Sequence, residues 1–537
     1  MHLTEKILII AVATTLIQNA NAQTDAICID ANASSMEWFD ASLSGSLTLG
    51  SRLSTEADAG FSRYSEVKDD NKDSFQDSPE KELLHISNAW KYNGTSHTLK
   101  AGIEFNEGSL DGGQLPRLKY QVFANPYRYS QDSWNIKASA DDRINTGNLS
   151  ALTVRGSAEF AGTDSKAGHR ISNYSKTGFD AGFMYEPGSW YSTEDGGWRA
   201  GAELKSERYD YEYRFDPTGL ETAITETTQT ETTVSLVGGY IYKPDSKKIT
   251  HLTLKASYST EYNFFLTPSA RFAYNPNNWL QLSLFAENNR RTVRPLAENN
   301  IALSQQDKGL YLASSRLILL DKDLEQESSW DLGFNSSITL PFVEINGGYT
   351  YRYYKHHVIT DFDTDAHSIH FTSSPGKSYV HRAVISAESS PVEGLEINAT
   401  YIYEDARETL TDNRITQIPF IPKHNAGITA EYTPDGKWLI SASYSFLGGI
   451  RTPKPDFIQP MWESSTYSYD LLSICIERTF WDRLTLYAGG SNLTDSRQKN
   501  TVISPLDPWG DTFDSSMIYM PLRGARYFAG IRIQLKR

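Results

Sequence analysis

The chain has 537 residues, with 51 Lys and Arg against 66 Asp and Glu, which gives a formal net charge of −15. This acidic balance excludes the basic stripe that a nucleic-acid-binding protein needs. Two cysteines, Cys28 and Cys475, are too few for a disulfide framework in a chain of this length.

The first 22 residues have the layout of a secretory signal peptide. A short polar start ends at Lys6, an apolar run follows from Ile7 to Ile17, and Ala20–Ala22 is a small-residue cleavage site. We expect the mature chain to begin at Gln23, with residues 23–35 as a short N-terminal segment. A buried strand or short helix is the alternative interpretation of the apolar run.

Beyond Ile17 no window approaches the roughly 20 apolar residues that a membrane-spanning helix needs. The mean hydropathy of −0.48 does not exclude a membrane, because lipid-facing and lumen-facing residues alternate in a β-barrel and average out polar. The 31 Tyr and 11 Trp far outnumber the 6 Met, and both favour the membrane–water interfaces where barrels carry aromatic girdles. If the chain enters a membrane, it does so as a barrel.

From Met36 onward, runs of about ten residues alternate apolar with small or polar side chains. Period two is the signature of a strand with two different faces. The alternation is clearest at residues 330–340, 395–403 and 438–446. The apolar parity would face lipid in a barrel and a core in a soluble sandwich, so alternation alone does not decide between them.

The connections between these runs fall into two classes. Short turns lie at residues 93–96, 145–148, 276–278 and 434–437, and long polar stretches lie at 69–80, 291–310, 407–422 and 499–522. Tight turns on one side and long loops on the other are how outer-membrane barrels are built. The sequence therefore predicts an all-β fold, a single antiparallel transmembrane barrel of about 22 strands over residues 36–537, with short periplasmic turns and long extracellular loops.

The densest group of potential metal ligands comprises His356, His357, Asp361, Asp363, Asp365, His367 and His370. Imidazole and carboxylate together suit transition metals. The carboxylate spacing is that of the start of a calcium loop, but Ala366 stands where such a loop has Gly and no Glu closes it. A metal site is one interpretation, and a solvated loop is the alternative.

No phosphate-binding loop, Cys-x-x-Cys pair or Gly-x-Ser-x-Gly elbow is present, so we expect neither an enzyme nor a cofactor. Charged residues expected on the lumen side include Glu404, Glu477, Arg478 and Arg532. On a water-facing wall such residues line a solute path or simply pair with one another.

The last seventy or so residues carry a motif in two parts. A strand-like run from Leu484 ends in Asn492, Leu493, Thr494 and Asp495, and the final run opens with Gly524, Arg526 and Tyr527. In this order, at the chain end, they resemble the end of a TonB-dependent outer-membrane receptor. The segment Phe513–Pro521 resembles members of the Bacteroidetes type.

The resemblance implies a Gram-negative outer-membrane location and passage of a bulky nutrient. Outer-membrane lipid and the barrel assembly machinery are the implied partners. Two departures stand out: Lys536 and Arg537 end the chain instead of an aromatic residue, and only residues 23–35 precede the first alternating run, where the family carries a plug domain.

We therefore expect a separately encoded plug, a surface lipoprotein partner, or a barrel that works without a plug; a remnant gene is a further alternative. The alternative function is a non-transporting surface or scaffold barrel that contacts partners through its loops. A secreted soluble β protein is the third.

Overall fold

The computed structural model describes residues 23–536 except residues 117–122, 148, 192–195, 217–222, 299–316, 366–367, 454–465, 500–501, 511–512 and 514–518. The predicted signal peptide lies outside the described residues and stays a prediction. No helix in the described part of the chain is long and apolar enough to cross a membrane.

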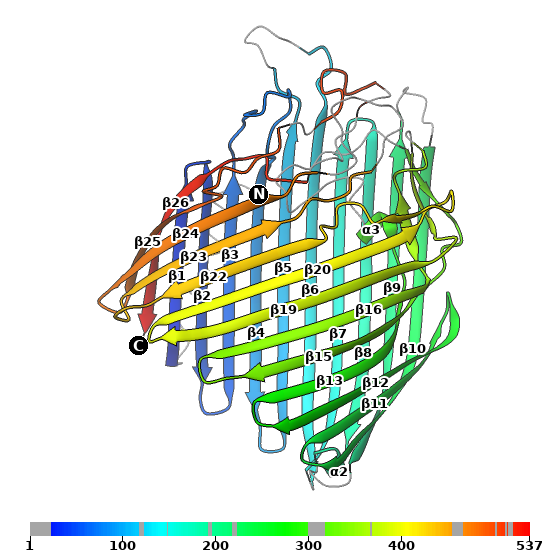
Figure 1. Ribbon diagram of the computed structural model, residues 1–537, viewed down its shortest axis with the longest axis vertical. Helices are drawn as coiled ribbons and strands as arrows, with labels where there is room; N and C mark the ends of the chain where they lie inside the picture. Colours follow the sequence, from blue (N-terminus) through cyan, green and yellow to red (C-terminus); the bar gives the residue numbers. More distant parts are fainter. Residues whose placement is uncertain are drawn as a thin grey trace.

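Antiparallel strands form one continuous curved wall (Figure 1). Its first half contains β1 (Gln23–Ser34), β2 (Trp38–Leu49), β3 (Leu53–Tyr64), β4 (Glu80–Asn93), β5 (His97–Gly113), β6 (Arg128–Gly147), β7 (Ser150–Ala167), β8 (Arg170–Glu186), β9 (Gly197–Phe215), β10 (Ala223–Asp245), β11 (Lys248–Ser259), β12 (Asn263–Asn277) and β13 (Leu280–Arg291). Its second half contains β15 (Glu327–Thr339), β16 (Val343–His356), β19 (Ser378–Val392), β20 (Leu395–Thr409), β21 (Ile415–Gln417), β22 (His424–Tyr432), β23 (Trp438–Leu447), β24 (Tyr469–Phe480), β25 (Leu484–Ser491) and β26 (Arg526–Lys536). A separate small sheet contains β14 (Leu317–Leu320), β17 (Val358–Asp361) and β18 (Ser368–Ser373), and two one-turn helices are α2 (Gly188–Tyr191) and α3 (Pro295–Glu298).

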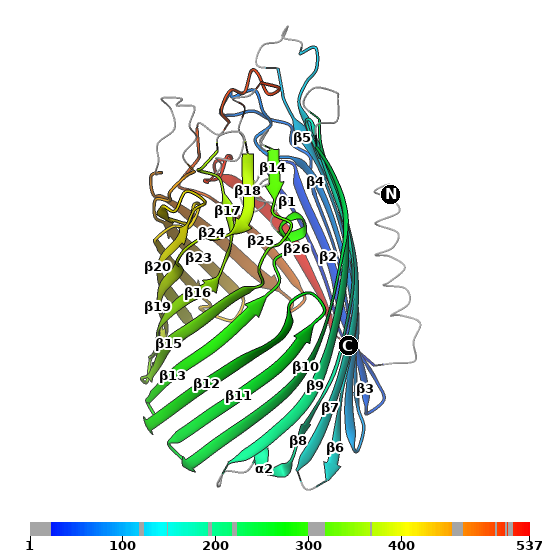
Figure 2. The same cartoon turned by 90° about the vertical axis from the view of Figure 1, so that its right-hand side faces the viewer.

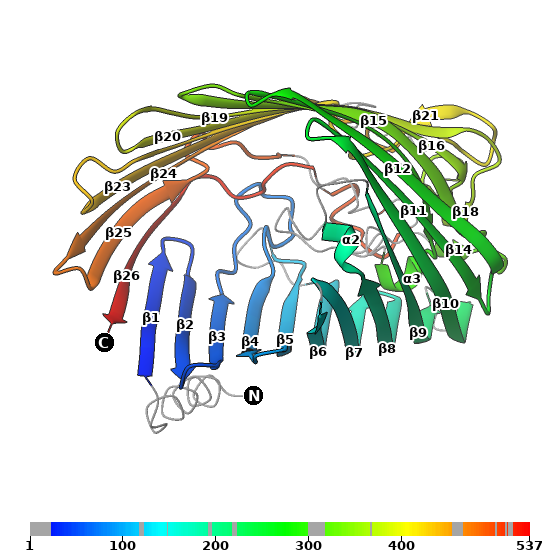
Figure 3. The same cartoon turned by 90° about the horizontal axis from the view of Figure 1, so that it is seen from below.

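The wall closes on itself because β1 pairs with both β2 and β26 (Figure 3). Ala31 lies opposite Ala41 on one side and Ile531 on the other. Residues 23–34 are therefore part of the wall, and the boundary expected at residue 36 is wrong. The alternation in β1 is easy to overlook, because Ala31 and other small residues share its outer parity with Ile27 and Ile29.

The predicted strand number is confirmed. The sheet has 23 strands, but β21 and β22 pair with successive stretches of β20, so the wall has 22 positions. Long connections lie at one end of the barrel and short turns at the other (Figure 1). This is the predicted arrangement of extracellular loops and periplasmic turns.

The outer parity of the wall is apolar and uncovered. Trp330, Leu332 and Phe334 on β15 keep 39%, 47% and 48% of their surface exposed, and the outer residues of β26, such as Tyr527 and Leu535, are exposed as well. A soluble protein rarely leaves so broad an apolar surface in water. The apolar residues that the sequence alternation assigned to lipid therefore do lie on the outer face of the barrel.

Strands β6, β7, β9 and β10 contain 20, 18, 19 and 23 residues. A tilted strand needs only about 9–11 residues to cross a bilayer. On β9, the outer parity changes from Leu204 to Arg208 and Asp210 towards the extracellular end. This side of the barrel therefore projects beyond the membrane.

Candidate functional site in the lumen

Charged side chains on the inner face of the closing seam pair with one another. Arg532 on β26 donates from Nε to Asp30 Oδ2 on β1 at 2.7 Å, and from Nη1 to Glu477 Oε2 on β24 at 3.0 Å. The Tyr487 hydroxyl donates to the other Asp30 oxygen. Glu477 and Arg532 thus lie in the lumen, where they join the last strands of the wall to the first.

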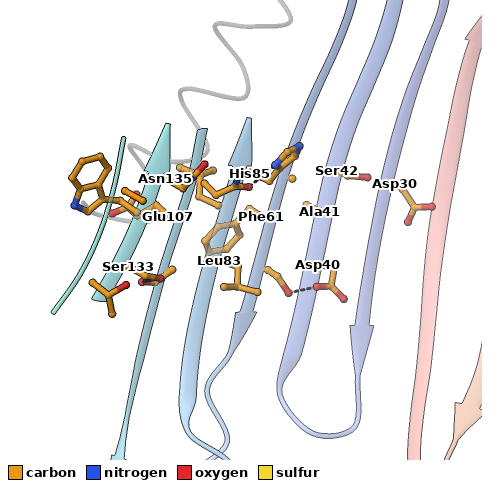
Figure 4. Close-up of a pocket in the computed structure, with 18 of the residues that line it drawn as sticks. Asp30, Asp40, Ala41, Ser42, Phe61, Leu83, His85, Glu107, Ser133 and Asn135 are labelled. Atoms are coloured by element: carbon orange, nitrogen blue, oxygen red, sulfur yellow. Dashed lines mark hydrogen bonds between the residues drawn. The ribbon is translucent and has the colours of Figure 1, made fainter. Parts of the chain in front are cut away.

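This network borders a lumenal cavity of about 1040 Å³. Asp30, Asp40, His85 and Asn135 line it from β1, β2, β4 and β6 (Figure 4). Glu159 and Glu477 add further carboxylates to its wall, which gives this half of the lumen an acidic character. The volume lies at the upper end of the range for small-molecule sites, about 300–1,000 Å³.

A second lumenal cavity, of about 600 Å³, lies along strands β8–β13. Lys176 contacts Glu159 at 2.8 Å and Glu207 at 3.4 Å, and Lys255 contacts Glu203 at 2.6 Å. The Lys176 ammonium group is held between carboxylates of the two neighbouring strands, and Lys255 reaches across β10 to its carboxylate on β9. The inner wall is thus polar and largely paired, as expected for a surface in contact with water.

Arg478 is not in the lumen, so that prediction is wrong. Successive residues of a strand point to opposite faces, and its neighbour Glu477 points inward. The Arg478 guanidinium lies over the Trp438 ring at 4.8 Å and over the Phe480 ring at 4.9 Å, on the outer parity at the periplasmic end. Glu404 does lie on the inner face, 3.5 Å from Arg382.

The small sheet and α3 fold inward against the lumenal face of β9 (Figure 2). Three inward-facing tyrosines of β9, Tyr209, Tyr211 and Tyr213, are only 7%, 6% and 3% exposed. Their cover consists of the apolar side chains Leu296, Ile318, Phe362, Ile369 and Phe371. Two extracellular connections therefore occupy part of the lumen and narrow its upper end.

Arg294, directly before α3, fastens this inward fold to the wall. Its side chain is almost fully buried, and it donates to Glu231 Oε2 on β10 at 3.0 Å and to Glu261 Oε2 at 2.8 Å. A third hydrogen bond runs to Gln229 Oε1 at 3.1 Å. Charge-assisted hydrogen bonds of this kind are among the stronger polar contacts in proteins.

The sequence-based prediction missed these three tyrosines, although the local sequence of β9 contains a pattern that marks them. The run Arg208–Arg214 alternates Tyr with charged residues, but here the aromatic residues take the inner parity and the charges the outer one. A reversed alternation at the extracellular end of a long strand indicates wall that lies outside the bilayer. Its inner face is then free to carry an apolar contact.

The candidate metal ligands are held by separate protein partners. Asp363 Oδ1 and Oδ2 accept from Arg451 Nη1 and Nη2, both at 2.9 Å. Asp361 accepts from the Thr364 and Thr411 hydroxyls at 2.6 Å each. Although burial acts in the opposite direction, these hydrogen bonds hold the pKa of Asp361 below its usual range.

The other candidates are similarly dispersed. His370 Nε2 lies 2.8 Å from Asp321 Oδ1, Asp365 accepts from the Ser368 hydroxyl, and His356 contacts Glu325. Burial lowers the pKa of His357 to about 4, so this ring is neutral at pH 7. His367 lies outside the described residues. Among the described residues no three His, Cys, Asp or Glu side chains group closely enough to hold a metal ion, and metal binding stays a prediction.

We expect Asp363→Asn to loosen the inward-folded hairpin without any metal being involved. Arg451 would lose a bidentate carboxylate partner that is itself buried, and removing one partner of a buried ion pair costs about 3–5 kcal/mol. The measurement is protease cleavage of the 357–377 connection in the purified protein, which should accelerate in the variant. Addition of EDTA to the wild-type protein should leave cleavage unchanged; acceleration by EDTA would contradict this assignment.

The first half of the terminal motif ends β25 and turns the chain. Asn492 donates from Nδ2 to the Ser496 and Arg523 carbonyls at 3.0 and 2.9 Å, and Thr494 donates to the Asp470 carbonyl at 2.7 Å. Asn492 and Asp495 both adopt positive φ, which Asn and Asp tolerate better than other non-glycine residues. The motif thus fastens both ends of the long 492–525 connection.

The second half of the motif fits against the first. A Cβ added to Gly524 would lie 1.9 Å from Asp495 Oδ1, so any other residue would displace this carboxylate. The Tyr527 N–H donates to the Ser35 hydroxyl at 3.1 Å, which links β26 to the turn after β1. Residues 514–518 of the segment Phe513–Pro521 lie outside the described residues, so the Bacteroidetes-type resemblance stays a prediction.

Three extracellular connections, 65–79, 114–127 and 492–525, pack around one apolar cluster. Its members are Phe75, Leu110, Tyr127, Tyr129, Val502, Phe513 and Leu522. Beneath it, Arg523 contacts Glu66 and lies 3.8 Å from Asp70 and 3.9 Å from Asp77. Burial raises the pKa of Asp77 to about 7, despite a hydrogen bond from the Asp70 N–H and the nearby Arg523 charge.

This pKa predicts that the loop cluster weakens as pH rises. The folded pKa of Asp77 is above its usual value of 3.8, so folding favours the protonated carboxyl and the associated stability is lost between about pH 4 and 7. Asp77→Asn should remove this dependence and protect the 65–79 connection at pH 8. Limited proteolysis of wild type and variant, side by side at pH 5 and 8, measures it. Equal cleavage of the two proteins at pH 8 would contradict the prediction.

The comparisons with known proteins agree with this architecture. The sequence matches the family described as TonB dependent receptor-like, beta-barrel, over residues 33–493. No curated protein matches the sequence. A point mutant of the ferric enterobactin receptor PfeA from Pseudomonas aeruginosa superposes with a TM-score of 0.69 at 12% identity, over 96% of this chain and 81% of that one.

Two further receptors give similar values. The siderophore receptor PiuA from Acinetobacter baumannii has a TM-score of 0.68 at 11% identity, over 95% of this chain and 82% of its own. The ferric-catecholate import receptor Fiu from E. coli K12 has a TM-score of 0.68 at 10% identity with the same coverage. At such identities the likeness shows the fold alone, and the family is shown by the sequence match. The chain belongs to the TonB-dependent receptor-like β-barrel family, which resides in the outer membrane of Gram-negative bacteria.

Proposed function

We propose that the barrel takes up a bulky nutrient across the outer membrane through its lumen. The observation that carries this proposal is the inner wall, where paired polar side chains border cavities of about 1040 and 600 Å³. A scaffold that transported nothing would have no need of so large a water-accessible interior. Because the similar structures include ferric enterobactin and siderophore receptors, iron chelates are the first solutes to test.

Conductance of the purified protein in planar bilayers tests the proposal. We expect discrete currents, smaller than an unobstructed barrel of this strand number would give, because the small sheet and α3 occupy part of the lumen. Liposome swelling with sugars of increasing size then gives the size limit of the passage. A protein that is folded in the bilayer, carries no current and admits no solute would support the alternative of a surface or scaffold barrel.

A separate plug-bearing chain, or a surface lipoprotein, is proposed as the partner that closes and energises this passage. The acidic cavity beside Asp30, Asp40 and Glu477 supports this proposal, because the inward-folded loops leave this part of the lumen unfilled. Co-expression with a plug or lipoprotein encoded beside the gene should lower the conductance of the purified complex. Currents identical to those of the barrel alone would refute this part of the proposal. Assembly machinery for outer-membrane barrels remains an expected partner.

A further inference from the structure

A pocket of about 650 Å³ lies on the inner face of the closing seam, at its extracellular end. Its wall comes from β2–β4 and β23–β26, and the segment 521–524 of the last long connection covers it. It is separate from the acidic cavity, which lies further down the same strands. The terminal motif thus borders a cavity as well as turning the chain.

The pocket differs chemically from the rest of the lumen. Trp38, Tyr64 and Tyr469 supply aromatic surface, and three cationic residues, Lys81, Arg523 and Arg526, border it. No Asp or Glu is among the described residues that line it. The charge of the pocket lining is therefore positive, whereas the chain as a whole has a net charge of −15. Apolar walls with a few convergent charged groups are the usual form of a small-molecule site.

Arg526 is the cation that remains for a ligand. Its guanidinium lies over the Trp38 ring at 5.2 Å, and Nε donates to the Ser491 hydroxyl at 3.2 Å. Its two terminal nitrogens make no hydrogen bond or ion pair with any residue that the structure describes. A guanidinium stacked on an aromatic ring, with its fork open, is preorganised for bidentate contact with an oxyanion.

Two neighbours sharpen this assignment. Arg523 is already held by Glu66, Asp70 and Asp77, so its charge is largely neutralised and it serves to fix the cover of the pocket. The indole N–H of Trp38 is buried without an acceptor among the described residues. Its nitrogen has almost no surface open to the pocket, so Trp38 offers an occupant the face of its ring rather than a hydrogen bond.

We propose that this seam pocket binds an organic anion, a carboxylate or similar oxyanion carried on a flat apolar ring. The oxyanion meets the Arg526 fork, and the ring packs against Trp38, Tyr469 and the neighbouring leucine side chains. The inference deepens the proposed uptake function, since it names a solute class for the extracellular entrance. Its test is direct binding, so a failure here is distinguishable from a failure to conduct.

The test uses the full chain in lipid nanodiscs and a simple probe, 2-naphthoate, titrated by calorimetry beside its neutral analogue 2-naphthamide. We expect wild type to bind naphthoate about tenfold or more tightly than naphthamide, the difference that charge-assisted hydrogen bonds give. Arg526→Gln should remove that preference, because it weakens naphthoate binding far more than naphthamide binding. Arg526→Lys should retain part of it, because an ammonium group keeps the charge without the fork.

Arg478→Gln is the matched control. Arg478 is also stacked on a tryptophan, but it lies on the outer face at the opposite end of the barrel. Each variant is first shown to be folded by the difference in gel migration between unheated and heated samples. Equal loss of naphthoate binding in both variants, no loss in Arg526→Gln, or equal binding of the anion and the amide by wild type would overturn the proposal.

Discussion

Phe371→Asp is expected to widen the conducting pathway. The Phe371 ring is 1% exposed and lies with Ile369, which is 0% exposed, in the apolar contact between the small sheet and the tyrosines of β9. Removing a buried phenylalanine costs about 3–5 kcal/mol, and the substituted carboxylate adds the cost of an unpaired buried charge. That shifts a local opening equilibrium by about two to three orders of magnitude or more.

Single-channel recording in planar bilayers measures the effect as a higher conductance, and liposome swelling measures it as entry of larger sugars. Phe528→Asp is the matched control, because Phe528 borders the acidic cavity on the opposite wall and holds no loop. The barrel should stay folded in both variants, since the hairpin is not part of the closed wall. Unchanged conductance and size limit in folded Phe371→Asp protein would show that the inward loops do not limit the passage.

Ala31→Pro is expected to prevent closure of the barrel. Ala31 lies in the middle of β1, paired with β2 on one side and β26 on the other. Proline has no backbone N–H, so β1 would lose a hydrogen bond to one of these two strands, and proline is not tolerated in central strands. In the bilayer core no water replaces the lost bond, so the unsatisfied groups cost several kcal/mol and the seam opens an edge to lipid.

The measurement is the difference in gel migration between unheated and heated protein after refolding into detergent or lipid, which should disappear in the variant. Ala31→Val keeps the N–H and the lipid-facing parity, so it should fold like wild type. A fully folded Ala31→Pro barrel would mean that β1 is dispensable. The result would then restore the boundary at residue 36 that the alternation suggested.

The sequence was sufficient for the main architecture. Period-two alternation, unequal connections and the motif from Asn492 to Tyr527 predicted an outer-membrane barrel of about 22 strands and the lipid-facing parity of its wall. These features are readable because each strand of such a barrel pairs with its sequence neighbours. Lipid on one face and water on the other impose a repeating two-sided pattern, and short turns keep it in register.

Only the tertiary structure decided features that depend on residues far apart in the chain. The partner of Asp30 is Arg532, at the other end of the sequence, and no local pattern marks β1 as the strand that closes the wall. The seven candidate metal ligands looked like one cluster in the sequence, yet Asp363 and His370 point to different partners. The packing of the small sheet over Tyr209 and the unpaired terminal nitrogens of Arg526 likewise depend on residues far apart in the chain. Loops lack a repeating pattern, so where they pack and which charges they leave free is set by three-dimensional contacts alone.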